Sequence, residues 1–337
     1  MLDLIDVQSL AVADFDGDGF RDLAIGRKDD VLVLFGDGTG AFPRMADLPE
    51  SNSNYFGAAA GDLDGDEIAD LVVSQANNDA VLVYRSSSGG EFADPLTFAT
   101  GDNPQRLALV RLDRDSTLDL VVSVMADDSV EVLLGDGAGG FGEPTAFASG
   151  GGQPFELALG AFNPDSMADL VVGNLNDKSL AVLLGAPAGQ LELAQVYPLP
   201  GKPRSTAVAD FDLDGHLDVA AALEDLDRVQ VLYGDGLGGL LDDGVELLVG
   251  DRPVGAVTAD FNLDDAPDLL VINRDDASVG LSFGAPELPG QFMAPVLMDP
   301  LNGFSSMSVV ISADLNHDGV ADVIIGGAGV RAMISNP

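Results

Sequence analysis

The chain of 337 residues contains no cysteine and no tryptophan. Without cysteine, neither a disulfide nor a thiolate zinc site can stabilise the fold. Basic residues are scarce, because 15 Lys and Arg stand against 56 Asp and Glu, and the formal net charge of −41 argues against nucleic acid as a partner. No apolar run approaches the roughly 18 residues that a membrane-spanning helix needs. Residues 1–6 lack the basic start of a signal peptide, so we expect neither an export signal in this chain nor membrane insertion.

The chain repeats one short acidic phrase seven times. Its clearest copy reads Asp-Phe-Asp-Gly-Asp-Gly-Phe-Arg-Asp over residues 14–22. The other copies start at Asp62, Arg111, Ala161, Asp210, Asp260 and Asp314. A regular spacing of about 50 residues is typical of solenoids and propellers, in which each unit buries its apolar face only against its neighbours.

Each repeat contains short β-branched and aliphatic runs separated by Gly, Asp and Asn. In the first repeat these runs cover 9–13, 22–26 and 31–36, and a weaker run begins at Phe42. This pattern predicts four antiparallel strands per repeat, named A to D, with D the most polar. Seven such units predict an all-β fold, a seven-bladed β-propeller that forms a single domain. We expect blades over 8–50, 53–100, 103–150, 152–200, 202–250, 252–300, and 303–337 together with 1–7.

The last repeat supplies only three strands before the sequence ends at Pro337. Residues 2–7 read as an additional strand before the first strand A. We therefore predict that this segment completes blade seven and closes the ring by pairing the N- and C-terminal segments, which removes an open sheet edge. A closed ring needs no second copy, so we expect a monomeric domain.

The acidic phrase has the donor pattern of a calcium loop. Its nine places carry carboxylate or amide oxygens at one, three, five and nine, and place seven would add a backbone carbonyl. Ca²⁺ prefers six to eight oxygen ligands, whereas Mg²⁺ rarely uses cages made only of protein groups. The predicted ligands are Asp14, Asp16, Asp18, Phe20 and Asp22; Asp62, Asp64, Asp66, Ile68 and Asp70; Asp210, Asp212, Asp214, His216 and Asp218; Asp260, Asn262, Asp264, Ala266 and Asp268; and Asp314, Asn316, Asp318, Val320 and Asp322.

Two loops depart from this donor pattern. Loop three has Arg111 at place one, and loop four has Ala161 at place one and Asn163 at place three. We expect Arg111 to replace the cation by pairing with Asp113, Asp115 or Asp119. The sequence therefore predicts about five calcium sites, in loops one, two, five, six and seven.

The phrases over 12–19 and 208–215 resemble FG-GAP/VCBS repeats, which also build the integrin α-subunit propeller. The resemblance covers essentially the whole chain. It implies that the loop between the first two strands of a blade binds Ca²⁺, and it implies an extracellular or periplasmic protein, with adhesion as one expected role. Functions within the family are diverse, so the resemblance indicates fold and metal more strongly than activity.

The face opposite the acidic loops should carry the D–A connections and the B–C turns. Nine of the fifteen Lys and Arg fall in these segments. On so acidic a chain, cations beside aromatic residues predict a surface for a protein or acidic glycan ligand. The expected ligand-face residues are Tyr55, Phe56, Arg106, Phe155, Arg204, Arg228, Arg252 and Arg274.

Catalysis has little support in the sequence, and we predict no enzyme. The only two histidines, His216 and His317, lie inside acidic loops, and no nucleophile elbow, zinc-protease motif or phosphate loop occurs. One alternative is a polysaccharide lyase or hydrolase that uses Tyr55 with Arg106 or Arg204. The other is a scaffold domain of a larger secreted protein without a ligand of its own.

Overall fold

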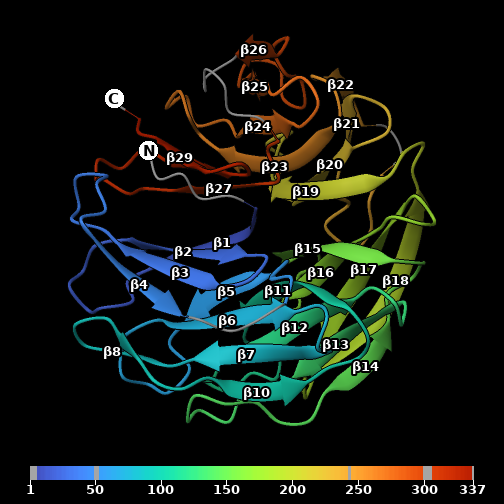
Figure 1. Ribbon diagram of the computed structural model, residues 1–337. Coiled ribbons are helices and arrows are strands. Elements are labelled where there is room, and N and C mark those ends of the chain that lie inside the picture. Colours follow the sequence, from blue (N-terminus) through green and yellow to red (C-terminus); the bar gives the residue numbers. More distant parts are fainter. Residues whose placement is uncertain (1–5, 49–52, 242–243, 299–305, 336–337) are drawn as a thin grey trace.

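The computed structural model is a seven-bladed β-propeller, as the repeats predicted (Figure 1). The structure describes residues 6–48, 53–241, 244–298 and 306–335. Within these residues the chain contains strands and turns but no helix, so nothing described could cross a membrane as a helix. The sheets are antiparallel, and the described strands form six sheets of four strands and a seventh of three.

The strands follow one another from the channel outward in every blade but the second, where a small ribbon interrupts the order. Blade one consists of β1 (Val7–Ala13), β2 (Asp22–Arg27), β3 (Val31–Phe35) and β4 (Arg44–Leu48). Blade two consists of β5 (Ala58–Gly61), β6 (Asp70–Gln75), β7 (Ala80–Tyr84) and β10 (Leu96–Ala99), with β8 (Ser86–Ser87) and β9 (Glu91–Phe92) as the ribbon. Blade three consists of β11 (Pro104–Val110), β12 (Asp119–Val124), β13 (Ser129–Leu133) and β14 (Thr145–Ala148).

The remaining blades repeat this order. Blade four consists of β15 (Pro154–Gly160), β16 (Asp169–Asn174), β17 (Ser179–Ala186) and β18 (Gln190–Pro198). Blade five consists of β19 (Pro203–Ala209), β20 (Asp218–Leu223), β21 (Arg228–Leu232) and β22 (Glu246–Leu248). Blade six consists of β23 (Pro253–Ala259), β24 (Asp268–Asn273), β25 (Val279–Ser282) and β26 (Val296–Met298), and blade seven of β27 (Val309–Ala313), β28 (Asp322–Gly326) and β29 (Val330–Met333).

The apolar core is divided among the seams between blades. Successive residues of a strand point to opposite faces of its sheet. In β6, therefore, Leu71 and Val73 pack toward blade one, while Val72 packs toward blade three. One buried cluster fills each of the seven seams. Strands B and C are almost entirely buried, whereas the outermost strands, such as β4 and β14, are largely exposed.

The seam between blades seven and one closes the ring. The Val7 amide donates to the Gly327 carbonyl at 3.1 Å, and the Ser308 hydroxyl donates to the Val7 carbonyl at 2.5 Å. Leu10 and Ile25 share a buried cluster with Val309 across this seam. Of the predicted closing strand 2–7, residues 2–5 lie outside the described residues. Val7 itself was assigned to the wrong strand, because it begins β1, the innermost strand of blade one, where its side chain is buried.

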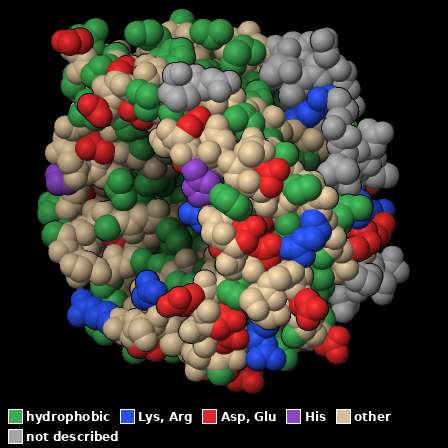
Figure 2. Space-filling view, turned by 90° about the vertical axis from the view of Figure 1, so that its left-hand side faces the viewer, with side chains coloured by type: hydrophobic (Ala, Val, Ile, Leu, Met, Phe, Trp, Pro, Cys, Tyr) green, Lys and Arg blue, Asp and Glu red, His purple; other side chains and the backbone are tan. Residues whose placement is uncertain are grey.

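The two ends of the channel differ in the loops that surround them. The A–B loops, which contain both histidines, lie at one end, and the B–C turns and D–A connections lie at the other. Figure 2 shows the face with histidine side chains, which is hollowed near its centre, with apolar side chains visible inside the hollow. The candidate metal loops and the candidate ligand face therefore lie at opposite ends of the molecule.

Candidate functional site

The aspartate at place nine has the same role in every acidic loop. In loop one, Asp22 is fully buried, and its two carboxylate oxygens accept the backbone amides of Phe15 at 2.7 Å and Gly36 at 2.8 Å. The same pair of bonds, one to place two and one to the end of strand C or just beyond it, occurs at Asp70, Asp119, Asp169, Asp218, Asp268 and Asp322. Place nine therefore fastens each loop to its own blade.

This burial changes the acidity of the place-nine carboxyls. Desolvation raises the pKa of Asp22, Asp70 and Asp218 to about 6, against the lowering effect of their backbone hydrogen bonds. In loop one the charges of Asp14 and Asp16 raise the pKa of Asp22 further. A nearby cation would favour the ionised form of these groups.

Place one organises the turn in the five loops where it is aspartate. In loop one, Asp14 accepts the amide of Gly17 at 2.7 Å with one oxygen and that of Gly19 at 2.8 Å with the other. The bond to place six recurs in loops two, five, six and seven. In these five loops places four and six both have positive φ, 75° at Gly17 and 90° at Gly19 in loop one. Glycine reaches this conformation without strain, which is why it is frequent at these places.

Three loops bring three carboxylates close enough to share one ion. Ligand oxygens lie within 4.8 Å of one another in Asp14, Asp16 and Asp18 of loop one, and in Asp62, Asp64 and Asp66 of loop two. In loop five the group is Asp210, Asp212 and Asp218, so place nine completes the group in place of place five. These hard oxygen donors fit Ca²⁺.

Loops six and seven have asparagine at place three. The Asn262 side chain donates to Asp264 at 2.9 Å and accepts the Asp264 amide at 3.1 Å, and Asn316 holds Asp318 in the same way. Each loop thus keeps oxygen donors at places one, three and five, with one charge fewer.

Loops three and four have a different backbone as well as different side chains. Ser116, at place six of loop three, is not among the residues with positive φ, and Pro164 occupies place four of loop four, where its ring fixes a negative φ. Among the described residues Arg111 forms no close ion pair with a carboxylate of its loop, although its charge helps to lower the pKa of Asp115. Its Nε donates to the Ser116 carbonyl at 3.1 Å instead, because the exposed side chain folds back on its own turn.

In loops one and five the side chain of place seven lies against the C–D turn of its own blade. The rings of Phe20 and His216 lie against Gly38 and Gly236, at distances that leave no room for a Cβ on either glycine. At Ala266 and Val320 the place-seven side chain is buried. The carbonyl ligand role of Phe20, Ile68, His216, Ala266 and Val320 stays a prediction.

The opposite face is held together by aspartates that the sequence analysis did not single out. Asp79, Asp128 and Asp227 in the B–C turns accept the amides of Asn103, Gln153 and Arg252 in the next blade, at 2.8–3.0 Å. All three donors have positive φ. The signal for this role was Asp at the same place of three B–C turns, in blades two, three and five. These three carboxylates therefore connect neighbouring blades.

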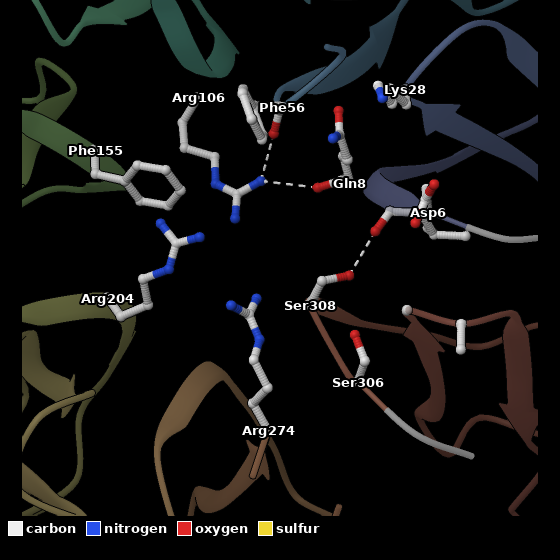
Figure 3. A pocket seen from close by; sticks show the side chains of 13 residues that line it. Asp6, Gln8, Lys28, Phe56, Arg106, Phe155, Arg204, Arg274, Ser306 and Ser308 are labelled. Atoms are coloured by element: carbon white, nitrogen blue, oxygen red, sulfur yellow. Dashed lines mark hydrogen bonds between the residues drawn. The ribbon is translucent and has the colours of Figure 1, made fainter.

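Three arginines converge on a pocket at this end of the channel (Figure 3). The pocket has a volume of about 530 Å³. Arg106 comes from β11, Arg204 from β19, and Arg274 follows β24, so three different blades contribute. Figure 3 shows their guanidinium groups pointing toward one another into the open space. Lys28 and Asp6 also line it.

The three guanidinium groups are held differently. Arg106 donates to the carbonyls of Phe56 and Gln8, and its Nε lies 3.4 Å from Glu156. Arg204 stacks on the Phe155 ring, 3.7 Å from its centroid, and its Nε lies 3.6 Å from Glu224. Burial, together with the charge of Arg106, lowers the pKa of Arg204 to about 10.

Arg274 is the least neutralised of the three. Its Nε donates to the Met307 carbonyl at 2.9 Å, and within the described part of the chain it forms no ion pair. Burial and the charge of Arg252 lower the pKa of Arg274.

The predicted ligand-face residues separate into two groups. Phe56, Arg106, Phe155, Arg204 and Arg274 line the pocket. The remaining three do not line it: Tyr55 is fully buried in the seam between blades one and two, Arg228 pairs with Glu246, and Arg252 pairs with Asp275. Sequence position alone could not separate these groups, because the direction of a side chain at the end of a strand depends on the seam that it faces.

The sequence matches the model of the FG-GAP-like repeat family over residues 14–73, 62–122 and 162–221, about half of the chain. The chain belongs to the FG-GAP-like repeat family. In this FG-GAP protein the matched segments include the acidic loops of blades one to five. No curated protein matches the sequence closely enough to count as a relative.

Solved propellers resemble the whole FG-GAP ring. BBS1N, solved in complex with ARL6DN, has 13% identity and a TM-score of 0.66, covering 97% of this chain and 92% of its own. An Agrocybe aegerita lectin that recognises non-reducing terminal N-acetylglucosamine has 17% identity and a TM-score of 0.57, covering 96% and 86%. A functionally unknown protein from Desulfotomaculum acetoxidans DSM 771 has 15% identity and a TM-score of 0.60, covering 98% and 90%. At these identities the likeness shows the fold alone.

Proposed function

We propose that this FG-GAP propeller is a calcium-stabilised extracellular or periplasmic binding module, and that its ligand binds at the end of the channel opposite the acidic loops. Adhesion to a protein or an acidic glycan is the role that this arrangement fits. One observation carries the proposal: Arg106, Arg204 and Arg274 converge from three blades into one pocket on a chain of net charge −41. A pocket of this size, lined by a few convergent polar groups, is the usual form of a ligand site.

Calcium has a structural role in this proposal. Bound ions neutralise the carboxylate clusters of loops one, two and five, and the same donor places in loops six and seven bring the expected number to about five. A ligand that binds only the folded state stabilises it by about 2.7 kcal/mol per site when its free concentration is a hundredfold above Kd. We therefore expect thermal melting at millimolar Ca²⁺ to occur well above melting in EDTA.

Matched variants test the calcium assignment. Asp62→Ala, in a loop with three clustered carboxylates, is expected to remove one ion by calorimetric titration and to reduce the calcium-dependent rise in melting temperature. Asp113→Ala, in loop three, should leave the stoichiometry unchanged. Equal stoichiometry in the two variants would contradict the assignment of loop two as a calcium site.

Binding is favoured over catalysis by the position of Tyr55. The catalytic alternative requires Tyr55 beside Arg106 or Arg204, but Tyr55 is fully buried and does not line the pocket. The solved structures of similar fold include a lectin and a domain in complex with another protein. They support a binding role only as an analogy of fold.

The ligand face is tested by charge reversal. Wild-type protein in Ca²⁺ is screened against arrays of acidic glycans and peptides, and the hits are measured again with the Arg204→Glu/Arg274→Glu variant. We expect binding to be lost in this variant and kept in Arg228→Glu, which changes an arginine outside the pocket. Binding that survives the double reversal would refute the proposed face.

A further inference from the structure

The three arginines differ in how far protein groups already bind their guanidinium groups. Arg106 has a structural role, since its hydrogen bonds join β11 to Gln8 of blade one and to Phe56 of blade two. Within the described residues, the side chain of Arg204 makes no hydrogen bond to protein, and the side chain of Arg274 makes one, through Nε. The terminal nitrogens of these two side chains therefore remain available as donors. Two planar guanidinium groups that face one space provide the paired donors that a carboxylate accepts.

The charge balance limits the ligand to about one negative charge. Lys28 and the three arginines bring four positive charges to the pocket. Three carboxylates oppose them, from Asp6 on the lining and from Glu156 and Glu224 in ion pairs with two of the arginines. Arg252 and Asp275, whose charges also act on Arg274, form an ion pair and offset each other. The excess is a single positive charge. One carboxylate neutralises it, whereas a second anionic group in the pocket would be unbalanced.

The rim outside the pocket carries more anions than cations, because its cations are only Arg27, Lys178, Lys202, Arg228 and Arg252. The B–C turns and D–A connections expose aspartates at Asp29, Asp79, Asp102, Asp127, Asp128, Asp177, Asp225, Asp227, Asp251, Asp275 and Asp276. Like charges within about one Debye length, roughly 8 Å at physiological salt, repel each other measurably. A long polyanion would have to cross this rim to reach the arginines. A cationic ligand body is disfavoured in turn by the cations that line the pocket itself.

We propose that Arg204 and Arg274 bind the single carboxylate of an otherwise uncharged, hydroxylated body, the chemistry of one terminal uronic acid residue on a neutral glycan. This inference rests on the proposed function of the pocket as a binding site and specifies its ligand. The volume of about 530 Å³ accommodates the carboxylate together with the group that bears it. The apolar ring of Phe56 suits a face of a sugar ring, and the acceptor Asp6 suits its hydroxyls.

The experiment compares three probes on calcium-loaded protein by titration calorimetry and ligand-observed NMR. These are a neutral trisaccharide capped by one terminal glucuronate, the same trisaccharide capped by glucose, and a tetrasaccharide of glucuronate throughout. We expect the singly charged probe to bind at least tenfold more tightly than either of the others. Arg204→Gln and Arg274→Gln should each weaken it at least tenfold, while Arg228→Gln changes it less than twofold. Unchanged melting temperatures confirm that the variants are folded.

The outcomes separate this inference from the function on which it rests. Equal or tighter binding of the fully charged tetrasaccharide, still lost in Arg274→Gln, overturns the single-carboxylate inference and leaves the ligand face standing. A short basic peptide that displaces the uronate and binds more tightly overturns the glycan assignment. If none of the three probes binds, and the array hits bind the pocket variants as tightly as wild type, then both the single-carboxylate inference and the proposed ligand face are overturned.

Discussion

At the scale of the residue, the aspartate at place nine has a role in the fold that its backbone hydrogen bonds account for. Loops three and four have lost the aspartate at place one, yet Asp119 and Asp169 keep both backbone hydrogen bonds and complete burial. A fully buried acceptor of two amides cannot be removed without leaving both donors unpaired. The sequence indicated calcium ligation for place nine, and the structure adds a role that is common to all seven loops.

Replacing Asp119 by alanine tests this role where no calcium site is expected. The amides of Leu112 and Gly135 would lose their acceptor, and we expect the free energy of unfolding to fall by about 3 kcal/mol. Asp115→Ala, an exposed change in the same loop, should cost less than about 1 kcal/mol. Urea unfolding of both variants in EDTA and in Ca²⁺ is the measurement. A loss that appears only when Ca²⁺ is present would mean that Asp119 acts through a cation.

At the scale of the element, each A–B hairpin concentrates negative charge at its tip while burying one carboxyl at its base. Arg44 of β4 offsets part of this charge in loop one, where it pairs with Asp16 and stacks 3.6 Å from the centroid of the Phe35 ring. It also donates to the Gly89 carbonyl of blade two at 2.7 Å. The hairpin is therefore secured to two blades, although its charge is only partly neutralised without a cation.

The buried carboxyls predict an unusual pH dependence for the metal-free protein. Asp22, Asp70 and Asp218 have folded-state pKa values of about 6, above the ordinary 3.8. The folded state then binds more protons than the unfolded state between about pH 4 and 6, so stability falls as the pH rises through this window. In EDTA we expect a melting temperature several degrees higher at pH 5 than at pH 7.

Calcium should remove most of this difference, because it favours the ionised carboxylates. Asp37, Asp115 and Asp225 have lowered pKa values, so their contribution to stability is lost only below pH 4. They therefore do not affect the comparison of melting temperatures at pH 5 and pH 7. Scanning calorimetry at the two pH values, with and without Ca²⁺, checks both statements. A metal-free protein that melts higher at pH 7 would show that the buried carboxyls are not the dominant titrating groups.

At the scale of the whole molecule, the ring depends on a seam between the two ends of the chain. Six seams join blades that are neighbours in sequence. The seventh joins β1 to β27, so it brings together segments from opposite ends of the chain. Gly326 lies in this seam, and a Cβ there would meet Val7 at 2.5 Å and Val309 at 2.8 Å. Packing at this point is too close for any larger residue.

Gly326→Val is therefore expected to loosen the closing seam. Overpacking of this kind typically costs about 1–3 kcal/mol, and hydrogen exchange should accelerate first in β1 and β27. Gly142→Ala, where an added Cβ would find an ordinary contact at 3.6 Å, serves as the control. Exchange that accelerates equally in all blades would contradict a localised closure.

The sequence alone determined the seven-bladed propeller and the position of the acidic loops. Both follow from local repetition: alternating apolar runs specify strands, and Asp and Gly at fixed places specify one turn, wherever the blade lies in the ring. The same local reasoning could not separate Arg204 and Arg274 from Arg228 and Arg252, nor place Tyr55 in a seam. Those assignments depend on which side chains from different blades face one another, and only closure of the ring brings blades three, five and six around one pocket.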